Sequence, residues 1–229
     1  ENFSDAVYSM KTPTALIWGS NDRVAPLRTA RLLASRLPQA QFSLINGASH
    51  VPMKSHADLF MATLQAALEQ PIVPSRLWRD PAEPVKNLTC KRVYDTTYSG
   101  RYKNIILNGC RHVTFYNVQA EKIIAERSDI TLDNVTLTSP DIAIDSRQSL
   151  ITATNVNISA PIGIQATRSR LDLAGVDIVA GQQALAVKLK TRVIMSVSRI
   201  HSPLYEGYAH GAFSLRDTSL EKTLATPRP

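Results

Sequence analysis

Several features that define common classes of protein are missing from this sequence of 229 residues. It contains only two cysteines, which is too few for a scaffold held together by disulfides. No apolar run approaches the roughly 18 residues of a membrane-spanning helix, so we expect no membrane span. A secretory signal peptide is not recognisable either, because residues 1–10 are polar and have no basic n-region. With 44% hydrophobic and 20% charged residues, the composition is that of a globular chain.

Motifs for cofactors are also missing. No cluster of Cys and His has the spacing of a zinc site. No Gly-rich loop of the kind that holds phosphates is present, so we expect no nucleotide. The sequence therefore predicts no metal, no organic cofactor and no nucleic-acid partner.

The net charge of +7 is spread unevenly along the chain. Residues 1–70 hold six of the 26 basic and five of the 19 acidic residues, which leaves 20 basic and 14 acidic residues in 71–229. An excess of this kind favours anionic partners, and an acidic glycan or another anionic ligand is the partner expected for the second part of the chain. A solvated basic surface without a dedicated partner is the alternative.

Residues 1–70 have the pattern of alternating strands and helices. Short apolar runs predict strands over 14–18 and 42–45. Apolar residues at helical spacing predict helices over 26–37, with Pro at the first position, and over 57–68. The resulting strand–helix–strand–helix order predicts a parallel sheet.

Four prolines, at positions 71, 74, 81 and 84, follow this region. Because proline interrupts both helices and strand pairing, residues 71–86 are predicted to be a linker.

After the linker the chain repeats itself. Its units begin with the hexapeptides VTFYNV, ITLDNV, ITATNV, LDLAGV and VIMSVS, whose starts lie 17, 21, 20 and 22 residues apart. A third apolar pair closes three of the units, at Ile142/Ile144, Ile162/Ile164 and Leu185/Val187. Strands this short cannot bury their inner faces alone, so the units are expected to stack as a right-handed parallel β-helix. The alternative, a leucine-rich repeat, needs a helical segment that these units lack.

One column of the repeat is occupied by residues that tolerate tight corners. Asn117, Asn134 and Asn155 hold the same place in three successive units, and Gly175 holds it in the fourth. With this column, residues of about 87–217 resemble the pectin-lyase-like β-helix family, in which asparagine ladders are frequent. The resemblance implies the architecture and is not specific for an activity.

Cys90 and Cys110 lie one turn apart in this scheme. Neighbouring strands are about 4.8 Å apart, a distance that a disulfide can bridge. Both a disulfide between adjacent coils and two stacked free thiols fit this spacing.

Two motifs in residues 1–70 each place a functional side chain directly after a predicted strand. The first motif consists of Trp18, Gly19, Asp22 and Pro26, and the second of Gly47, His50, Pro52 and Met53. With these motifs, residues of about 8–70 resemble the C-terminal portion of an α/β-hydrolase. The resemblance implies that Asp22 is the acid and His50 the general base of a catalytic triad. Their chemistry agrees, because a histidine can accept a proton near neutral pH while a carboxylate orients its ring.

The nucleophile that this pair would serve is not recognisable. No Gly-x-Ser-x-Gly pentapeptide occurs, and Ser4, Ser9 and Ser20, which precede Asp22, lack the required neighbours. A sheet of two strands would also expose its edges and an apolar face. We therefore expect Glu1 not to be the natural beginning, and a missing upstream segment of the same protein to carry the nucleophile. The intact protein would hydrolyse an ester, thioester or amide, or transfer an acyl group.

The β-helix offers further candidate residues, because some enzymes with this fold act on polysaccharides through side chains on one exposed face. These candidates are Asp129, Asp133, Asp141, Asp145, Arg147 and Arg168. No spacing selects a catalytic carboxylate pair, and Asp141 and Asp145 are expected at the corners that flank a strand over 142–144. His112, His201 and His210 have no evident partners in the sequence.

The sequence thus predicts a chain of the α/β plus all-β class: a partial α/β-hydrolase sheet followed by a right-handed parallel β-helix. The predicted organisation is a hydrolase part over 1–70, a linker over 71–86, a β-helix for binding or assembly over 87–217, and a tail over 218–229. The alternatives are a non-catalytic structural or carbohydrate-binding protein and a polysaccharide-active β-helix enzyme.

Overall fold

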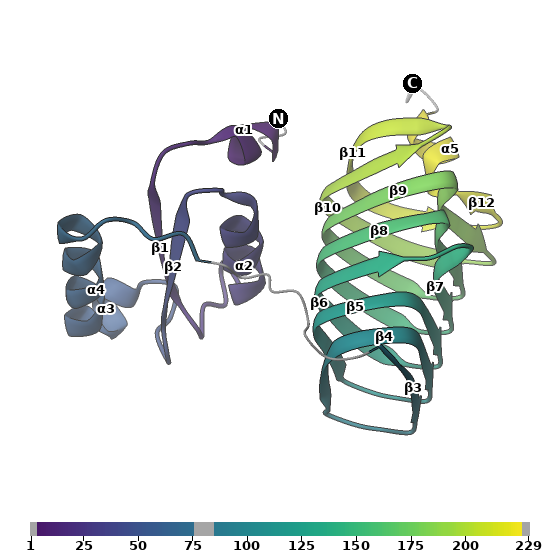
Figure 1. Cartoon of the computed structure of the whole chain (residues 1–229), viewed down its shortest axis with the longest axis horizontal. Helices are drawn as coiled ribbons and strands as arrows, with labels where there is room; N and C mark the ends of the chain where they lie inside the picture. The colour runs from purple at the N-terminus through teal and green to yellow at the C-terminus, as the bar shows by residue number, and fades with distance from the viewer. Residues whose placement is uncertain (1–3, 76–84, 226–229) are drawn as a thin grey trace. The chain divides into compact units, whose positions relative to one another are not determined.

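The computed structural model of the chain describes residues 4–75 and 85–225. The chain divides into two compact units, residues 1–79 and 80–229 (Figure 1). Within the described residues, no helix is both long enough and apolar enough to cross a bilayer.

The N-terminal unit is built on two parallel strands. Strand β1 (Thr14–Gly19) pairs along its whole length with β2 (Ala40–Ile45), and helix α2 (Leu27–Arg36) connects them. Helix α1 (Ser4–Ser9) precedes β1. The parallel pairing predicted from the order of strands and helices is confirmed.

The helices begin and end close to the predicted positions. Pro26 is the N-cap of α2 rather than its first residue, because its ψ of 152° is extended. A short helix that the sequence did not predict, α3 (Pro52–Ser55), follows β2. The last helix of the unit is α4 (Ala57–Glu69), one residue longer than predicted.

The chain does not leave this unit directly after α4. The backbone N–H of Ser75 donates a hydrogen bond to the carbonyl oxygen of Ala40 (2.8 Å), and the N–H of Phe42 donates to Ser75 Oγ (2.9 Å). Part of the predicted linker therefore runs beside β2. Residues 76–84 of that linker lie outside the described residues.

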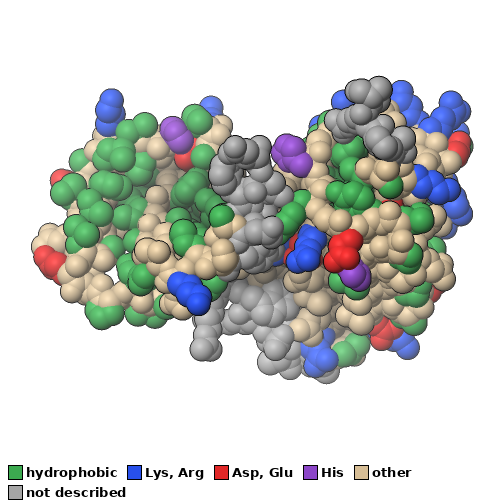
Figure 2. Space-filling model, turned by 90° about the horizontal axis from the view of Figure 1, so that it is seen from above, with side chains coloured by type: hydrophobic (Ala, Val, Ile, Leu, Met, Phe, Trp, Pro, Cys, Tyr) green, Lys and Arg blue, Asp and Glu red, His purple; other side chains and the backbone are tan. Residues whose placement is uncertain are grey.

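Much of the apolar surface of the N-terminal unit remains in contact with solvent. None of the described α4 residues is buried, and Leu68 keeps 78% of its surface exposed. Leu59, Met61 and Val24 are also more than half exposed. Hydrophobic side chains accordingly spread over the visible face of this unit (Figure 2). A hydrophobic surface of this kind is typical of a site that binds a ligand, another protein or another part of the same protein.

The C-terminal unit is a parallel β-solenoid that ends in an antiparallel hairpin (Figure 1). In its main sheet the strands follow the order β11-β10-β9-β8-β6-β5-β4-β3. Its elements are β3 (Lys86–Lys91), β4 (Thr97–Asn108), β5 (Val113–Glu126), β6 (Asp129–Thr138), β7 (Ile142–Arg147), β8 (Leu150–Thr167), β9 (Arg170–Lys188), β10 (Thr191–Ser202), β11 (Tyr205–Leu215), β12 (Thr218–Ser219) and α5 (Leu220–Ala225).

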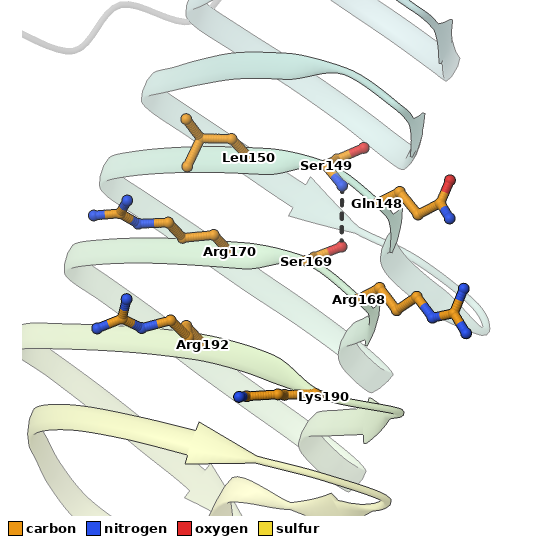
Figure 3. Close-up of a pocket in the computed structure, with 8 residues that line it drawn as sticks. All are labelled: Gln148, Ser149, Leu150, Arg168, Ser169, Arg170, Lys190 and Arg192. Atoms are coloured by element: carbon orange, nitrogen blue, oxygen red, sulfur yellow. Dashed lines mark hydrogen bonds between the residues drawn. The ribbon is translucent and has the colours of Figure 1, made fainter.

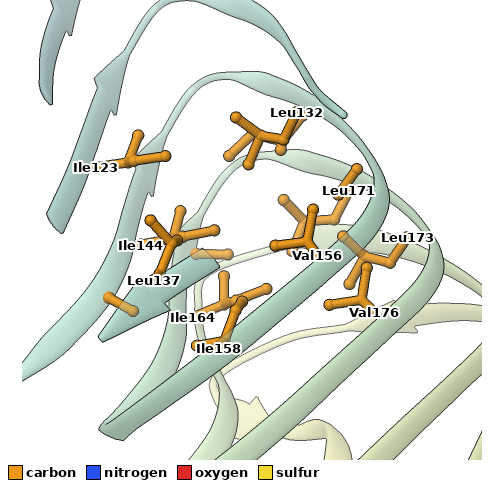
Figure 4. Close-up of a cluster of buried hydrophobic side chains, with 14 of the residues drawn as sticks. Ile123, Leu132, Leu137, Ile144, Val156, Ile158, Ile164, Leu171, Leu173 and Val176 are labelled. Carbon is orange, nitrogen blue, oxygen red and sulfur yellow. The ribbon is translucent and has the colours of Figure 1, made fainter. Parts of the chain in front are cut away.

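The repeated hexapeptides lie in register on successive coils. Their first residues pair in one unbroken column, Val113, Ile130, Ile151, Leu171 and Val193. All five side chains are buried, in a core of stacked aliphatic residues (Figure 4). Because each fully buried aliphatic side chain contributes roughly 1.5–3 kcal/mol, the stacking stabilises coils that could not fold singly.

The third apolar pair stacks as predicted between β7 and β8, where Ile142 and Ile144 lie opposite Ile162 and Ile164, but the next coil differs. Ile164 lies opposite Leu185, whereas Ile162 lies opposite Gln183. The predicted partnership of Ile162 with Leu185 is therefore wrong by two positions. The cause is a register shift in the β8–β9 pairing just before Ile162.

The predicted corner column is confirmed by the backbone. Asn117, Asn134, Asn155 and Gly175 all have φ between 53° and 62°, in the left-handed region. The Asn155 side-chain amide donates a hydrogen bond to Asn134 Oδ1 on the coil before it. Asparagine can occupy such corners while its side chain joins neighbouring coils.

A second ladder, which no pattern in the sequence indicated, stabilises another corner. Four buried hydroxyls each accept a hydrogen bond from the backbone N–H of the corresponding corner residue on the preceding coil. The distances from nitrogen to oxygen are 3.0–3.4 Å. Each N–H donates to the hydroxyl of the next residue in the series Cys110, Ser128, Ser149, Ser169 and Thr191. These bonds satisfy corner N–H groups that would otherwise be buried without partners.

The end of the solenoid is closed by segments within the predicted tail. Strand β12 pairs with β9, and α5 packs with Leu220 fully buried. The equally buried Glu221 accepts hydrogen bonds from the backbone N–H groups of Ala184 and Leu185. The Glu221 carboxylate thus supplies the hydrogen-bond acceptors that the carbonyl groups of a further strand would otherwise supply to these two N–H groups.

Cys90 and Cys110 are both free and buried. Their sulfur atoms lie 2.8 Å apart on adjacent coils. Burial, together with the neighbouring Cys110 thiol, raises the pKa of Cys90 to about 12. The structure therefore contains the two stacked thiols rather than the disulfide.

Candidate active site

Asp22 is held by the turn that follows β1. Its Oδ1 accepts hydrogen bonds from the backbone N–H groups of Val24 (2.9 Å) and Ala25 (2.8 Å). The indole Nε1 of Trp18 donates to the Ala25 carbonyl oxygen (2.8 Å) and so ties the end of the turn to the strand. Hydrogen bonds within its own loop therefore hold the Asp22 carboxylate in position, independently of His50.

The loops that follow β1 and β2 are joined to each other by the backbone. The backbone N–H of Ser20 donates a hydrogen bond to the carbonyl oxygen of Ile45 (3.0 Å). The backbone N–H of Asn21 donates to the carbonyl oxygen of Ala48 (2.9 Å). In the opposite direction, the N–H of Gly47 donates to Ser20 Oγ (2.8 Å). Parallel strands end at the same edge of a sheet, and these bonds hold both loops at that edge.

Gly19 allows the two loops to approach closely. A Cβ atom at this position would lie 2.4 Å from the carbonyl oxygens of both Ala48 and Ser49. Because those atoms belong to the backbone, a larger side chain would have to displace the loop that leads to His50. The sequence marked Gly19 as part of a motif, and its steric role is visible only in the structure.

The structure brings Asp22 and His50 together. His50 Nδ1 lies 2.9 Å from Asp22 Oδ2 and 3.1 Å from Oδ1. The Asp22 side chain is only 5% exposed, whereas that of His50 is 48% exposed. A carboxylate at Nδ1 favours the tautomer with the proton on that nitrogen, which leaves Nε2 able to accept another.

Opposing influences act on the pKa of Asp22. Burial of the carboxyl works to raise the pKa, but the hydrogen bond from His50, the backbone N–H groups of Ala25 and Val24, and the charge of His50 work to lower it. The lowering influences prevail, so the pKa of Asp22 lies below the ordinary value of 3.8. Asp22 is therefore ionised at neutral pH, as an orienting carboxylate needs to be.

No nucleophile is bonded to His50 Nε2 among the residues that the structure describes. Ser20 Oγ accepts its bond from Gly47, and Ser9 Oγ donates to the Ala6 carbonyl oxygen. The Ser4 side chain lies outside the described part of the chain. The described residues therefore bring together an imidazole and a carboxylate.

Two of the acidic candidates in the solenoid, Asp141 and Asp145, contact neighbouring cations. Asp145 and Arg147 form an ion pair of 2.8 Å, and this contact raises the pKa of Arg147. Both residues belong to β7, so the prediction that Asp145 lies at a corner beyond the strand is wrong. Asp141 lies 3.7 Å from the Lys122 ammonium group on the coil before it. These contacts indicate structural roles for Asp141 and Asp145.

Two histidines in the solenoid have partners that the sequence did not reveal. His112 Nδ1 lies 3.2 Å from Asp95, and its Nε2 lies 3.8 Å from Asp129. His201 lies 3.2 Å from Glu206 across the β10–β11 hairpin. The partners come from neighbouring coils or strands, at distances along the chain that no local motif marks. Among the described residues, no three His, Cys, Asp or Glu side chains are close enough to hold a metal ion together.

Part of the chain is similar to known esterases. It is 29% identical over 63 residues to proteins described as pimeloyl-[acyl-carrier protein] methyl ester esterase, from the Paris, Corby and Lens strains of Legionella pneumophila. The match covers 28% of this chain and 26% of each of these proteins, so the chain spans about a quarter of the length of the curated relatives it matches. No protein-family profile and no solved structure matches the chain. The similarity supports a hydrolase-like region within it.

Proposed function

We propose that the N-terminal unit is the acid–base portion of a serine hydrolase, and that the β-solenoid is its binding or assembly module. The observation that carries this proposal is the contact of His50 Nδ1 with the almost buried carboxylate of Asp22. The similarity of part of the chain to methyl ester esterases supports an ester as the bond that is cleaved. Thioesters, amides and acyl transfer follow the same chemistry.

In the proposed reaction His50 acts first as base and then as acid. Its Nε2 takes the proton of a serine hydroxyl while the serine oxygen attacks the acyl carbon. His50 then gives that proton to the departing alkoxide, and an acyl-enzyme remains. In the second half His50 takes a proton from a water molecule whose oxygen attacks the acyl carbon, the bond from that carbon to the serine oxygen breaks, and His50 returns the proton to the serine as the carboxylic acid is released. Asp22 stays ionised throughout and stabilises the imidazolium that forms twice.

The serine is proposed to lie in a segment of the intact protein that precedes Asp22. Triads on this fold follow the chain order nucleophile, acid, base. The exposed apolar residues of α4, and a sheet of only two strands among the described residues, are consistent with further structure packed against this unit. The coverage of only 26% of the esterases is consistent with the same arrangement.

The proposal is tested by locating the serine in the protein expressed from its full coding sequence. A fluorophosphonate ester reacts covalently with a serine only where a base activates it. We expect one labelled serine upstream of Asp22, found by mass spectrometry of the digested protein. His50→Ala should abolish labelling while the circular dichroism spectrum stays unchanged. A folded protein that is not labelled, or whose labelling survives His50→Ala, would exclude the triad.

A further inference from the structure

One outward-facing column of the solenoid changes the sign of its charge along its length. Asp129 lies opposite Leu150 in the β6–β8 register, and Leu150 lies opposite Arg170 in the β8–β9 register. Arg170 in turn lies opposite Arg192 in the β9–β10 register. The residue that follows each of the four is buried in the core, so the four side chains themselves point outward. These four residues, which run from a carboxylate through an apolar side chain to two guanidinium groups, are named the charged column below.

The positive end of the charged column is open to solvent. Arg170 and Arg192 are exposed, and their side chains extend to the same side as Leu150 (Figure 3). Lys190 lines the same groove of about 420 Å³ and extends to that side as well. Within the described part of the chain, none of the three cations forms an ion pair. Like charges on neighbouring strands repel, so a carboxylate brought to this end would be attracted and would also offset that repulsion.

The negative end of the column has an acceptor to spare. Asp129 Oδ2 lies 3.8 Å from His112 Nε2, and the Asp129 side chain keeps 33% of its surface exposed. Its Oδ1 has no partner among the residues that the structure describes. His112 Nδ1 lies 3.2 Å from the Asp95 carboxylate, so a second negative charge is close by. This end can therefore accept hydrogen bonds from a guanidinium group.

We propose that two copies of this chain pair through the charged column, as a dimer with a two-fold axis at Leu150. The axis lies in the interface and runs along the strands, so it sets the column of one copy end for end against that of the other. Leu150 then meets Leu150 of the second copy. Asp129 and Arg170 lie one coil to either side of Leu150, so each Asp129 meets Arg170 of the other copy.

A second copy fits this surface better than a polyanion does. A polyanion would be attracted to the positive end but repelled by Asp129, whereas the reversed column offers each charge its opposite. The two partly exposed Leu150 side chains would also be buried against each other. One face of a few coils is at the small end of specific interfaces, so the dimer should dissociate on dilution. The dimer rests on the assembly role proposed for the solenoid and does not involve the Asp22–His50 pair.

The test is to reverse the two charges of the 229-residue chain separately and then together. Sedimentation velocity at rising protein concentration should show monomer and dimer, with more monomer at about 0.5 M salt, because salt screens exposed charges. Arg170→Asp and Asp129→Arg should each raise the dissociation constant at least about tenfold, because each places like charges opposite one another twice. The two substitutions in one chain should return it to within about threefold of the original value, because the pairing is restored with the signs exchanged.

Mixing the two single variants gives a second readout. Each variant alone should be mostly monomeric, yet together they should form a dimer with one copy of each, because every charge then meets its opposite. Native mass spectrometry distinguishes this dimer by its mass. The matched control is Arg101→Asp, which makes the same change in charge at an exposed position beside Gln119, beyond the Asn117 corner. The control should leave the dissociation constant unchanged.

Weakening in both single variants, with recovery in the double variant and in the mixture, supports the proposal. Weakening without recovery would overturn the pairing of Asp129 with Arg170. A chain that stays monomeric at every concentration, or that associates beyond a dimer, would overturn the two-fold arrangement.

Two further outcomes would overturn the site itself. Association that no charge variant alters would show that the copies meet elsewhere, for example through the exposed apolar residues of α4. Equal weakening by Arg101→Asp would show that only the overall charge matters. None of these measurements involves turnover, so failure of the dimer and failure of the triad are distinguished.

Discussion

His50 Nδ1 lies 2.9 Å from Asp22 Oδ2, although the two residues are 28 positions apart in the chain. Each side chain stands in a loop beyond the end of a parallel strand, and backbone hydrogen bonds join the two loops. The contact is thus a consequence of parallel pairing, which delivers two sequence-distant groups to one edge of the sheet.

Asp22→Asn should lower turnover by roughly ten-thousand-fold in the protein expressed from its full coding sequence. An amide at this position favours the wrong tautomer of His50 and cannot stabilise its charged form. The rate is measured with a chromogenic ester. Asp58→Asn, an exposed aspartate in the first turn of α4, is the matched control and should leave the rate unchanged. A similar loss in both variants would indicate that Asp22 has only a structural role.

The carboxyl carbon of Asp22 should titrate below pH 3.8 in the folded chain, as followed by ¹³C NMR. Because the folded pKa is depressed, the ionised carboxylate adds stability above the unfolded pKa, and this stability is lost as the pH falls through the folded pKa. His50→Ala removes a hydrogen bond and a positive charge, so the midpoint should rise. His56→Ala is the control and should not move it. An unchanged midpoint in His50→Ala would contradict the contact.

Gly19→Ala should destabilise the N-terminal unit by about 1–3 kcal/mol, because its Cβ would overlap two carbonyl oxygens of the His50 loop. The change is followed by urea unfolding and by the rate of ester hydrolysis, and both should fall together. Gly181→Ala is the control, since its Cβ would meet nothing closer than 3.7 Å. A fully stable and active Gly19→Ala protein would contradict the close approach of Gly19 to the loop that leads to His50.

Ser149→Ala should destabilise the solenoid by about 1–3 kcal/mol, because the buried N–H of Ser128 would lose its acceptor. Urea unfolding monitored by far-ultraviolet circular dichroism measures the difference. Ser159→Ala, at an exposed position of β8, should change the unfolding free energy by no more than about 0.5 kcal/mol. Equal effects in the two variants would argue against the hydroxyl ladder.

Cys90 should resist thiol reagents in the folded chain. Burial and the neighbouring Cys110 thiol raise the pKa of Cys90 to about 12, well above pH 8, so little of the reactive thiolate form is present. Ellman's reagent should therefore react slowly in buffer and rapidly in guanidinium chloride. Rapid reaction of the folded protein, or an intact mass two hydrogens lower than expected, would contradict the free, buried pair.

The repeat of the solenoid was fixed by its sequence. Strands with alternating apolar residues can bury one face only by stacking, so the recurrence that starts at Val113 predicts which side chains share a column. Asn134 and Asn155 mark a corner for an equally local reason, since few residues tolerate a positive φ. Asp22 and His50 were predicted as a pair from their strand-end motifs.

Other features were decided only by the tertiary structure. The register shift before Ile162 changes which residues of β9 lie opposite those of β8. The partners of His112, the buried carboxylate of Glu221 and the grouping of Arg170 with Lys190 depend on neighbouring coils or on the closing helix. Sequence periodicity determines which residues point inward, because burial repeats with the strand. The outward-facing side chains are not constrained by that repeat, so their contacts follow from the stacking of the coils.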